Sequence, residues 1–175
     1  MTGARVQIAM VLGALLLTPA LAAAQIERGS WELTLAAVGT SNNDFDEHAI
    51  GFSGGVGYFV LDPLELSLRQ TLTYVKSSDS NATDASTTFA IDWHFLLGED
   101  HRWAPFIGGN VGYFYGDTVS DSFEYGPEVG LKYFVNSTTF LYFRAEWQFF
   151  QHFSGASNSS DDQQIVYGIG IGFRF

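Results

Sequence analysis

The sequence predicts an all-β fold: an eight-stranded antiparallel up-and-down transmembrane β-barrel. Three observations predict it. The N-terminus has the features of a removable export signal, the rest of the chain divides into eight alternating segments, and the polar face of those segments is rich in glycine.

Residues 1–24 are predicted to form a cleaved signal peptide. Arg5 precedes the apolar run 8–17, and small residues fill 20–24 before Gln25, which is the order of an export signal. Cleavage is expected after Ala24, with Ala22 as the alternative. A retained anchor is a second interpretation, but the run is short for a membrane span. Residues 25–175 are predicted to form one outer-membrane β-barrel domain.

Composition excludes several kinds of partner and site. The 175 residues carry a formal net charge of −11, which argues against nucleic acid. The chain has no cysteine, so neither a disulfide nor a thiolate zinc site can form. We expect no cofactor and no metal.

Alternation of apolar and polar residues defines the predicted strands. They cover 30–39, 49–60, 65–76, 86–97, 104–116, 123–135, 139–151 and 164–175. Such segments are long for globular strands and suit tilted strands that cross hydrocarbon, which need about 9–11 residues. The polar connections 40–48, 77–85, 117–122 and 152–163 alternate with the mostly shorter 61–64, 98–103 and 136–138. This alternation is typical of outer-membrane barrels, whose external loops exceed their periplasmic turns.

The polar face is predicted to point into the barrel. In segment 164–175, Ile169 and Phe173 share one face, while Gly170 and Arg174 share the other. Glycines suit a narrow, curved interior, and a soluble exterior would need more long charged side chains. The glycines of the polar face are Gly51, Gly55, Gly57, Gly108, Gly112, Gly126, Gly130, Gly168, Gly170 and Gly172. One residue, Gln70, interrupts the apolar face without an explanation from the pattern.

The inward face is predicted to carry a polar network. Its members are Glu32, Glu65, Arg69, Asp92, His94, Glu128, Lys132, Arg144, Glu146 and Arg174. Five acids face four bases, so the interior is predicted to be close to charge balance, because buried charges are tolerated only when paired. Eight strands enclose a space that side chains can fill, so we expect a salt-bridged interior and no open channel.

Several segments resemble the eight-stranded outer-membrane β-barrel family that includes the OmpA-barrel, OmpX and OmpW types. Residues 55–66 (GVGYFVLDPLEL), 104–113 (APFIGGNVGY) and 143–147 (FRAEW) resemble its turn and strand motifs. Phe173 and Phe175 resemble its C-terminal assembly signal. The resemblance implies insertion into the cell outer membrane after periplasmic chaperoning, with the barrel assembly machinery, membrane lipid and lipopolysaccharide as partners.

No catalytic constellation stands out, so we expect a non-enzymatic barrel with a structural or surface-interaction role. Two alternatives remain open. His152 and Ser154 resemble the H-x-S element of outer-membrane lipid A deacylases, although a His–Ser pair needs an orienting acid and only Asp161 and Asp162 lie nearby. The other alternative is an OmpW-like conduit for small apolar solutes.

Overall fold

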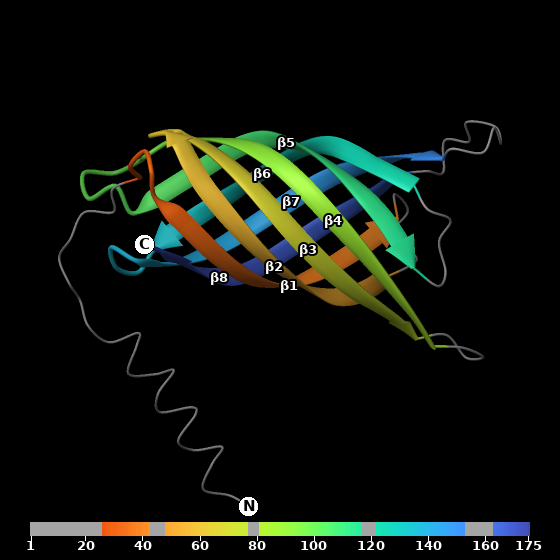
Figure 1. Ribbon diagram of the computed structural model, residues 1–175. Coiled ribbons are helices and arrows are strands. Elements are labelled where there is room, and N and C mark those ends of the chain that lie inside the picture. The colour runs from red at the N-terminus through yellow and green to blue at the C-terminus, as the bar shows by residue number, and fades with distance from the viewer. Residues whose placement is uncertain (1–25, 43–47, 77–80, 117–121, 153–162) are drawn as a thin grey trace, which may run out of the picture.

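A computed structural model describes residues 26–42, 48–76, 81–116, 122–152 and 163–175. The predicted signal peptide, 1–24, lies outside the described residues. The chain forms eight strands (Figure 1): β1 (Trp31–Asn42), β2 (His48–Leu61), β3 (Leu64–Lys76), β4 (Asn81–His94), β5 (Trp103–Gly116), β6 (Ser122–Phe134), β7 (Thr139–His152) and β8 (Gln163–Arg174). Among the described residues, no helix is long and apolar enough to cross a membrane.

The strands close into one barrel. Each strand pairs antiparallel with the next, and β1 pairs with β8 from Glu32 opposite Arg174 to Asn42 opposite Gln164. Closure leaves no sheet edge, which is what hydrocarbon demands because it offers no partner for a free backbone amide. The predicted eight-stranded up-and-down fold is confirmed.

The predicted strand limits agree within three residues except at β4. We predicted 86–97, but β4 begins at Asn81 and ends at His94. Its first residues are small and polar, so they show no outward apolar pattern, yet they continue the ladder with β3 as far as Asn81 opposite Lys76. Beyond His94 the amides of Phe95 and Leu97 still donate to the carbonyl oxygens of Pro105 and Trp103, both at 2.8 Å, and the chain then turns at Gly98, which has a φ of 86°.

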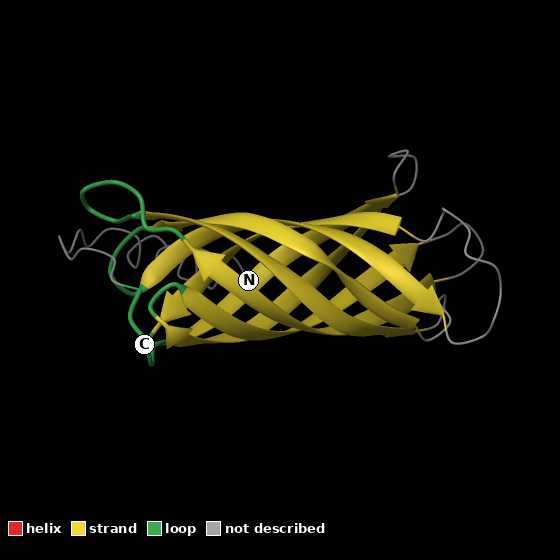
Figure 2. Ribbon diagram, turned by 90° about the horizontal axis from the view of Figure 1, so that it is seen from above, coloured by secondary structure: helices red, strands yellow, loops and turns green. Residues whose placement is uncertain are grey.

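The two ends of the barrel differ in their connections. We call the end where β1 begins and β8 finishes the terminal end, and the other the distal end. The terminal end carries the described connections 62–63, 95–102 and 135–138, which are drawn in green in Figure 2. The connection 95–102 is longer than the predicted 98–103 because β4 ends early.

The apolar face of the strands points outward and the polar face inward. Phe52 and Ile169 are 70% and 68% exposed, whereas Glu32 and Glu128 are 0% and 1% exposed. This is the reverse of a water-soluble protein, in which apolar side chains are buried and charged ones exposed, and it suits a protein surrounded by lipid.

Gln70, which interrupts the outward apolar face, is explained by its neighbours. Its side-chain oxygen accepts a 2.7 Å hydrogen bond from the Thr87 hydroxyl, and its amide donates at 3.1 Å to the Tyr115 hydroxyl. These partners satisfy a polar group that would otherwise be costly against hydrocarbon.

Candidate functional site: the barrel interior

The structure places all ten residues of the predicted polar network inside the barrel, each at most 6% exposed. They come from β1, β3, β4, β6, β7 and β8. The alternation of each strand explains this, because every second side chain points to the axis. Barrel closure then brings residues that are distant in sequence into contact, and they form two groups along the axis.

The first group surrounds the ammonium of Lys132, near the terminal end. Its Nζ donates to Glu32 Oε2 at 2.5 Å and to Glu65 Oε2 at 2.7 Å. The same Glu32 also accepts from Arg174 Nη2 at 3.2 Å. One base thus joins two carboxylates, and a second base completes the pairing of Glu32.

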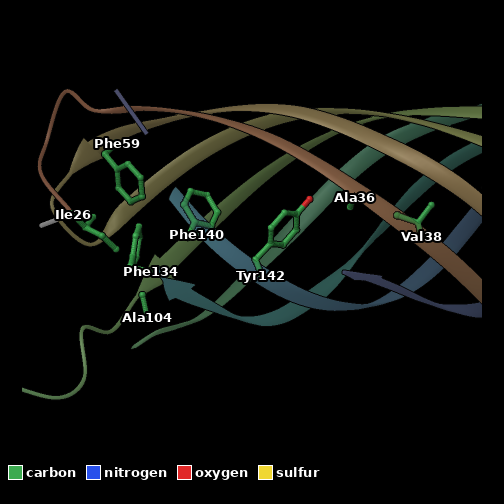
Figure 3. Close-up of a cluster of buried hydrophobic side chains, with 8 residues drawn as sticks. All are labelled: Ile26, Ala36, Val38, Phe59, Ala104, Phe134, Phe140 and Tyr142. Carbon is green, nitrogen blue, oxygen red and sulfur yellow. The ribbon is translucent and has the colours of Figure 1, made fainter. Parts of the chain in front are cut away.

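Aromatic rings enclose this group and close the terminal end of the lumen. The Lys132 Nζ lies 5.4 Å from the ring centre of Phe59 and 5.1 Å from that of Phe140, and the Arg174 guanidinium carbon lies 4.2 Å from that of Phe134. These distances are those of cation–π contacts. All three rings are at most 1% exposed, and Figure 3 shows them gathered with Ile26 and Ala104. We call Phe59, Phe134 and Phe140 the aromatic plug.

Two glycines make room for this packing. A Cβ at Gly57 would overlap the carboxylate of Glu65, and a Cβ at Gly172 would overlap the ring of Phe140. Any larger residue at these points would push the neighbouring side chain out of its place in the packed interior.

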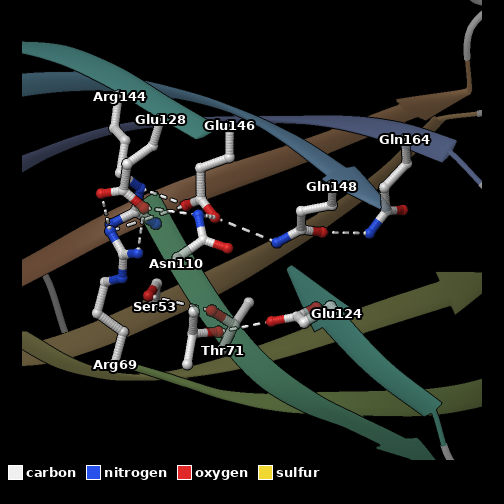
Figure 4. A network of polar contacts seen from close by, with 11 residues as sticks. Ser53, Arg69, Thr71, Asn110, Glu124, Glu128, Arg144, Glu146, Gln148 and Gln164 are labelled. Atoms are coloured by element: carbon white, nitrogen blue, oxygen red, sulfur yellow. Dashed lines mark hydrogen bonds and ion pairs between the residues drawn. The ribbon is translucent and has the colours of Figure 1, made fainter. Parts of the chain in front are cut away.

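The second group occupies the centre of the barrel (Figure 4). Arg69 binds Glu128 through two parallel hydrogen bonds of 2.9 and 2.6 Å. Arg144 Nε forms a 2.5 Å ion pair with Glu146. The amide of Asn110 donates to both carboxylates, at 2.7 Å to Glu128 and 3.1 Å to Glu146.

Amide groups extend the central group toward the distal end. Gln148 donates to Glu146 at 3.1 Å and accepts from Gln164 at 2.7 Å, as Figure 4 shows. Farther along, Glu124 accepts a 2.6 Å hydrogen bond from the Thr88 hydroxyl. Hydrogen bonds from neutral groups thus replace ion pairs in this direction.

His94 and Asp92 are integrated less fully. His94 Nε2 lies 3.4 Å from Glu65, and its ring lies between Phe59 and Phe106, with centroid distances of 5.3 and 5.1 Å. Neither ring nitrogen of His94 nor Asp92 Oδ1 has a hydrogen-bond partner among the described residues.

Sequence reasoning missed two kinds of interior residue. The first is the inward aromatic set, Phe59, Phe106, Phe134, Phe140 and Tyr142, each at most 6% exposed. Strand parity could have found them, since Phe134 and Lys132 share a face. The second is the buried acids Asp84 and Glu124, at 3% and 1%.

These two acids correct the predicted charge balance. Among the described residues, seven carboxyl side chains are buried against four Lys and Arg side chains. Asp84 was missed because the predicted strand began at residue 86. Glu124 shares the inward parity of Glu128 and was overlooked.

Two small cavities lie in the lumen, and Arg69 and Arg144 line both. One, of about 20 Å³, opens toward Thr40, Phe114 and Glu124. The other, of about 30 Å³, lies beside Glu65 and Lys132. A water molecule needs about 10–15 Å³, so each cavity has room for one to three waters. Side chains fill the space around these two cavities, and each cavity has room for only a few waters.

The remaining predicted residues lie elsewhere. Phe173 and Phe175 point outward at the terminal end, 39% and 75% exposed. His152 ends β7, with its backbone opposite Ser122, whereas Ser154 lies outside the described residues. Within the described ranges, no cluster of three or more His, Cys, Asp or Glu side chains could hold a metal ion.

Comparison with known proteins agrees with this architecture. A family model described as the outer membrane protein beta-barrel domain matches residues 10–175. No match is found among curated proteins.

Solved structures of other outer-membrane barrels share the fold. OprG from Pseudomonas aeruginosa is 12% identical, with a TM-score of 0.65 over 87% of this chain and 98% of that one. The N-terminal β-barrel domain of Pseudomonas aeruginosa OprF is 18% identical, with a TM-score of 0.58 over 85% and 98%. Neisserial surface protein A is 14% identical, with a TM-score of 0.57 over 83% and 94%. Identities this low support a shared fold and no shared activity.

Proposed function

Because this chain belongs to the outer membrane protein beta-barrel domain family, we propose that it is a non-enzymatic outer-membrane barrel with a structural or surface-interaction role. In this role the strands anchor the protein in the membrane, and the residues at the distal end meet the cell exterior. The lumen carries no solute.

The observation that carries the proposal is the closed terminal end of the lumen. Lys132 is held by two carboxylates within 2.7 Å and is surrounded by rings of the aromatic plug. Moving an ion past this point would require breaking buried ion pairs, which is strongly unfavourable. The central group forms a second barrier, because Arg69 and Arg144 separate the two small cavities.

Conductance across planar phosphatidylcholine bilayers tests the closed lumen. We expect no current steps of fixed size from the native barrel. The triple variant Phe59→Ala, Phe134→Ala, Phe140→Ala should raise the leak once Arg69 and Arg144 of the second barrier are also replaced by Ala, whereas replacing the outward Phe52 by Ala should leave it unchanged. Fixed-size steps from the native protein would contradict the proposal.

A lipid analysis tests the absence of enzymatic activity. The native protein and a Ser154→Ala variant are each expressed in a Gram-negative host that carries fully acylated lipid A. The mass of the extracted lipid A is then measured by mass spectrometry. We expect identical profiles. Loss of an acyl chain with the native protein alone would make it a deacylase that uses Ser154 and His152.

The proposal includes a route to the membrane. Residues 1–24 direct export and are removed, periplasmic chaperones carry the chain, and the barrel assembly machinery reads Phe173 and Phe175. Membrane lipid and lipopolysaccharide then surround the outward face. Phe175→Ser should lower the amount of folded, heat-modifiable protein in the outer-membrane fraction. Phe52→Ser is the matched control, because Phe52 is similarly exposed, at 70% against 75%, but lies far from the C-terminus. Equal losses in both variants would contradict a role in assembly.

A further inference from the structure

The outer wall of the barrel contains an apolar groove of about 660 Å³ across β4, β5, β6 and β7. Its sides are the outward side chains Phe89, Ile91, Val111, Tyr125 and Phe149. Its floor is the backbone around Gly109 and Pro127, which lie opposite each other in the β5–β6 ladder.

The groove exists because outward side chains are missing or short at two adjacent points. Gly109 has none, and Pro127 is compact. Pairing of β6 with β7 is also interrupted here, since Tyr125 pairs with Phe149 and Glu128 with Glu146, without the two pairs between. Pro127 has no N–H to donate to a ladder. A Cβ at Gly126 would overlap the carbonyl oxygen of Trp147, so β6 and β7 approach closely at this point.

The groove lies at mid-height on the lipid-facing wall. Gly109 is near the middle of β5 (Trp103–Gly116), and Pro127 is near the middle of β6 (Ser122–Phe134). The wall around it is continuous and apolar: Ile107, Val111 and Val129 are 54%, 49% and 50% exposed. In an outer-membrane barrel, surroundings at this height are hydrocarbon.

We propose that the groove seats one acyl chain of a membrane lipid and holds it longer than the lipids around the rest of the barrel. Lipid tails are as apolar as the groove, so water release supplies no driving force and van der Waals contact decides. A chain on a flat wall touches protein on one side, whereas a chain in the groove also touches both flanks and gains many small attractions. An acyl chain in the groove also gives van der Waals contacts to the side chains that line it, which would otherwise lack them.

Fluorescence quenching by a brominated lipid tests the proposal. In a variant with Trp31, Trp93 and Trp103 replaced by Phe, the remaining reporter is Trp147, whose ring stacks at 6.3 Å on the groove residue Phe149. The folded protein is placed in vesicles of dilauroyl phosphatidylcholine with increasing fractions of a phosphatidylcholine brominated at mid-chain on longer tails. We expect half-maximal quenching at a brominated fraction several-fold below that of random mixing.

Two glycine variants separate the groove from the surrounding lipid. Gly109→Leu fills the groove, and the new Cβ meets only the Gly126 carbonyl oxygen, at 3.6 Å. Gly54→Leu is the matched control on the outward face of β2, where a Cβ meets only the Thr34 carbonyl oxygen, at 4.0 Å. Gly109→Leu should return the quenching curve to random mixing, and Gly54→Leu should leave it unchanged.

The opposite results would overturn the proposal. A Gly109→Leu curve that superimposes on that of the parent would show that no chain is seated there. A dimer that Gly109→Leu abolishes while quenching is unchanged would assign the groove to a second copy of the chain. Should Gly109→Leu lose heat-modifiable mobility, Ile91→Trp fills the groove from the β4 side instead. Native mass spectrometry then measures how much brominated lipid the variant retains, and retention equal to that of the parent would overturn the proposal.

Discussion

The terminal and central parts of the lumen both pair buried carboxylates with Lys or Arg side chains, but they do so in different surroundings. Near the terminal end, Lys132 joins Glu32 and Glu65 among the rings of the aromatic plug. In the centre, Glu128 and Glu146 each accept from more than one donor, including Asn110. In the first group Glu65 therefore depends on a single ammonium, although Glu32 also pairs with Arg174, whereas the carboxylates of the second group each have several donors. We expect single substitutions to cost more in the first group.

The largest loss of stability is expected for Lys132→Met. It leaves Glu65 buried with only His94 nearby, and breaking a buried pair by removing one partner costs about 3–5 kcal/mol. Urea titration of the barrel in phosphatidylcholine vesicles, followed by tryptophan fluorescence, measures the free energy of unfolding. Adding Glu65→Gln to the variant should restore part of the loss, because it removes the orphaned charge. If Lys132→Met lowered the free energy of unfolding by less than Arg69→Met does, the central group would be the more sensitive of the two.

The second-largest loss of stability is expected for Gly172→Ala, which overpacks the terminal end of the lumen. Gly172→Ala forces a methyl group into the ring of Phe140, and extra volume in a filled interior costs about 1–3 kcal/mol. The same titration measures it. Phe140→Leu should rescue Gly172→Ala by removing the overlap, so the two losses should not add. Additive losses would mean that the cost of Gly172→Ala does not come from the overlap with the Phe140 ring.

A smaller loss is expected for Arg69→Met in the centre. Glu128 keeps its 2.7 Å hydrogen bond from Asn110, so the cost should stay within the range for an under-satisfied buried group, about 1–3 kcal/mol, and below that of Lys132→Met. The double change Arg69→Met, Asn110→Leu removes both donors and should cost more than the sum of the single changes. Simple additivity would mean that the donors do not substitute for each other.

The smallest loss of stability is expected on the outward face of the barrel, for Gln70→Leu. The change removes hydrogen bonds to Thr87 and Tyr115, and side-chain hydrogen bonds in membrane proteins average about 0.6 kcal/mol. Thr87→Val should have a similar effect, and the double variant should show coupling between the two positions. A loss above that of Arg69→Met would indicate that this outward group supports the fold.

Much of the fold could be predicted because each strand carries its own signal. Alternation at Ile169, Gly170 and Ile171 identifies a strand and its two faces without knowledge of any other strand. The start of β4 could not be predicted, because residues 81–85 lack this alternation and are held in the ladder by β3.

The interior was only partly predictable. Parity assigned Glu32, Glu65 and Lys132 to the inside, but it could not say that Lys132 would lie between the other two. The sequence separations of 100 and 67 residues are bridged only by the closed barrel. The groove was not predicted either, since Gly109 and Pro127 become neighbours only through the pairing of β5 with β6.

By itself, the sequence determined the eight strands, their inward and outward faces, and the family to which the chain belongs. The strands and their faces follow from local periodicity, which each segment expresses independently of its neighbours, whereas the family follows from the sequence match over residues 10–175. Only the tertiary structure decided which charges pair, where the aromatic plug closes the lumen, and where the outer wall is hollow. Those features depend on strand register around a closed barrel, which brings together atoms that no local pattern connects.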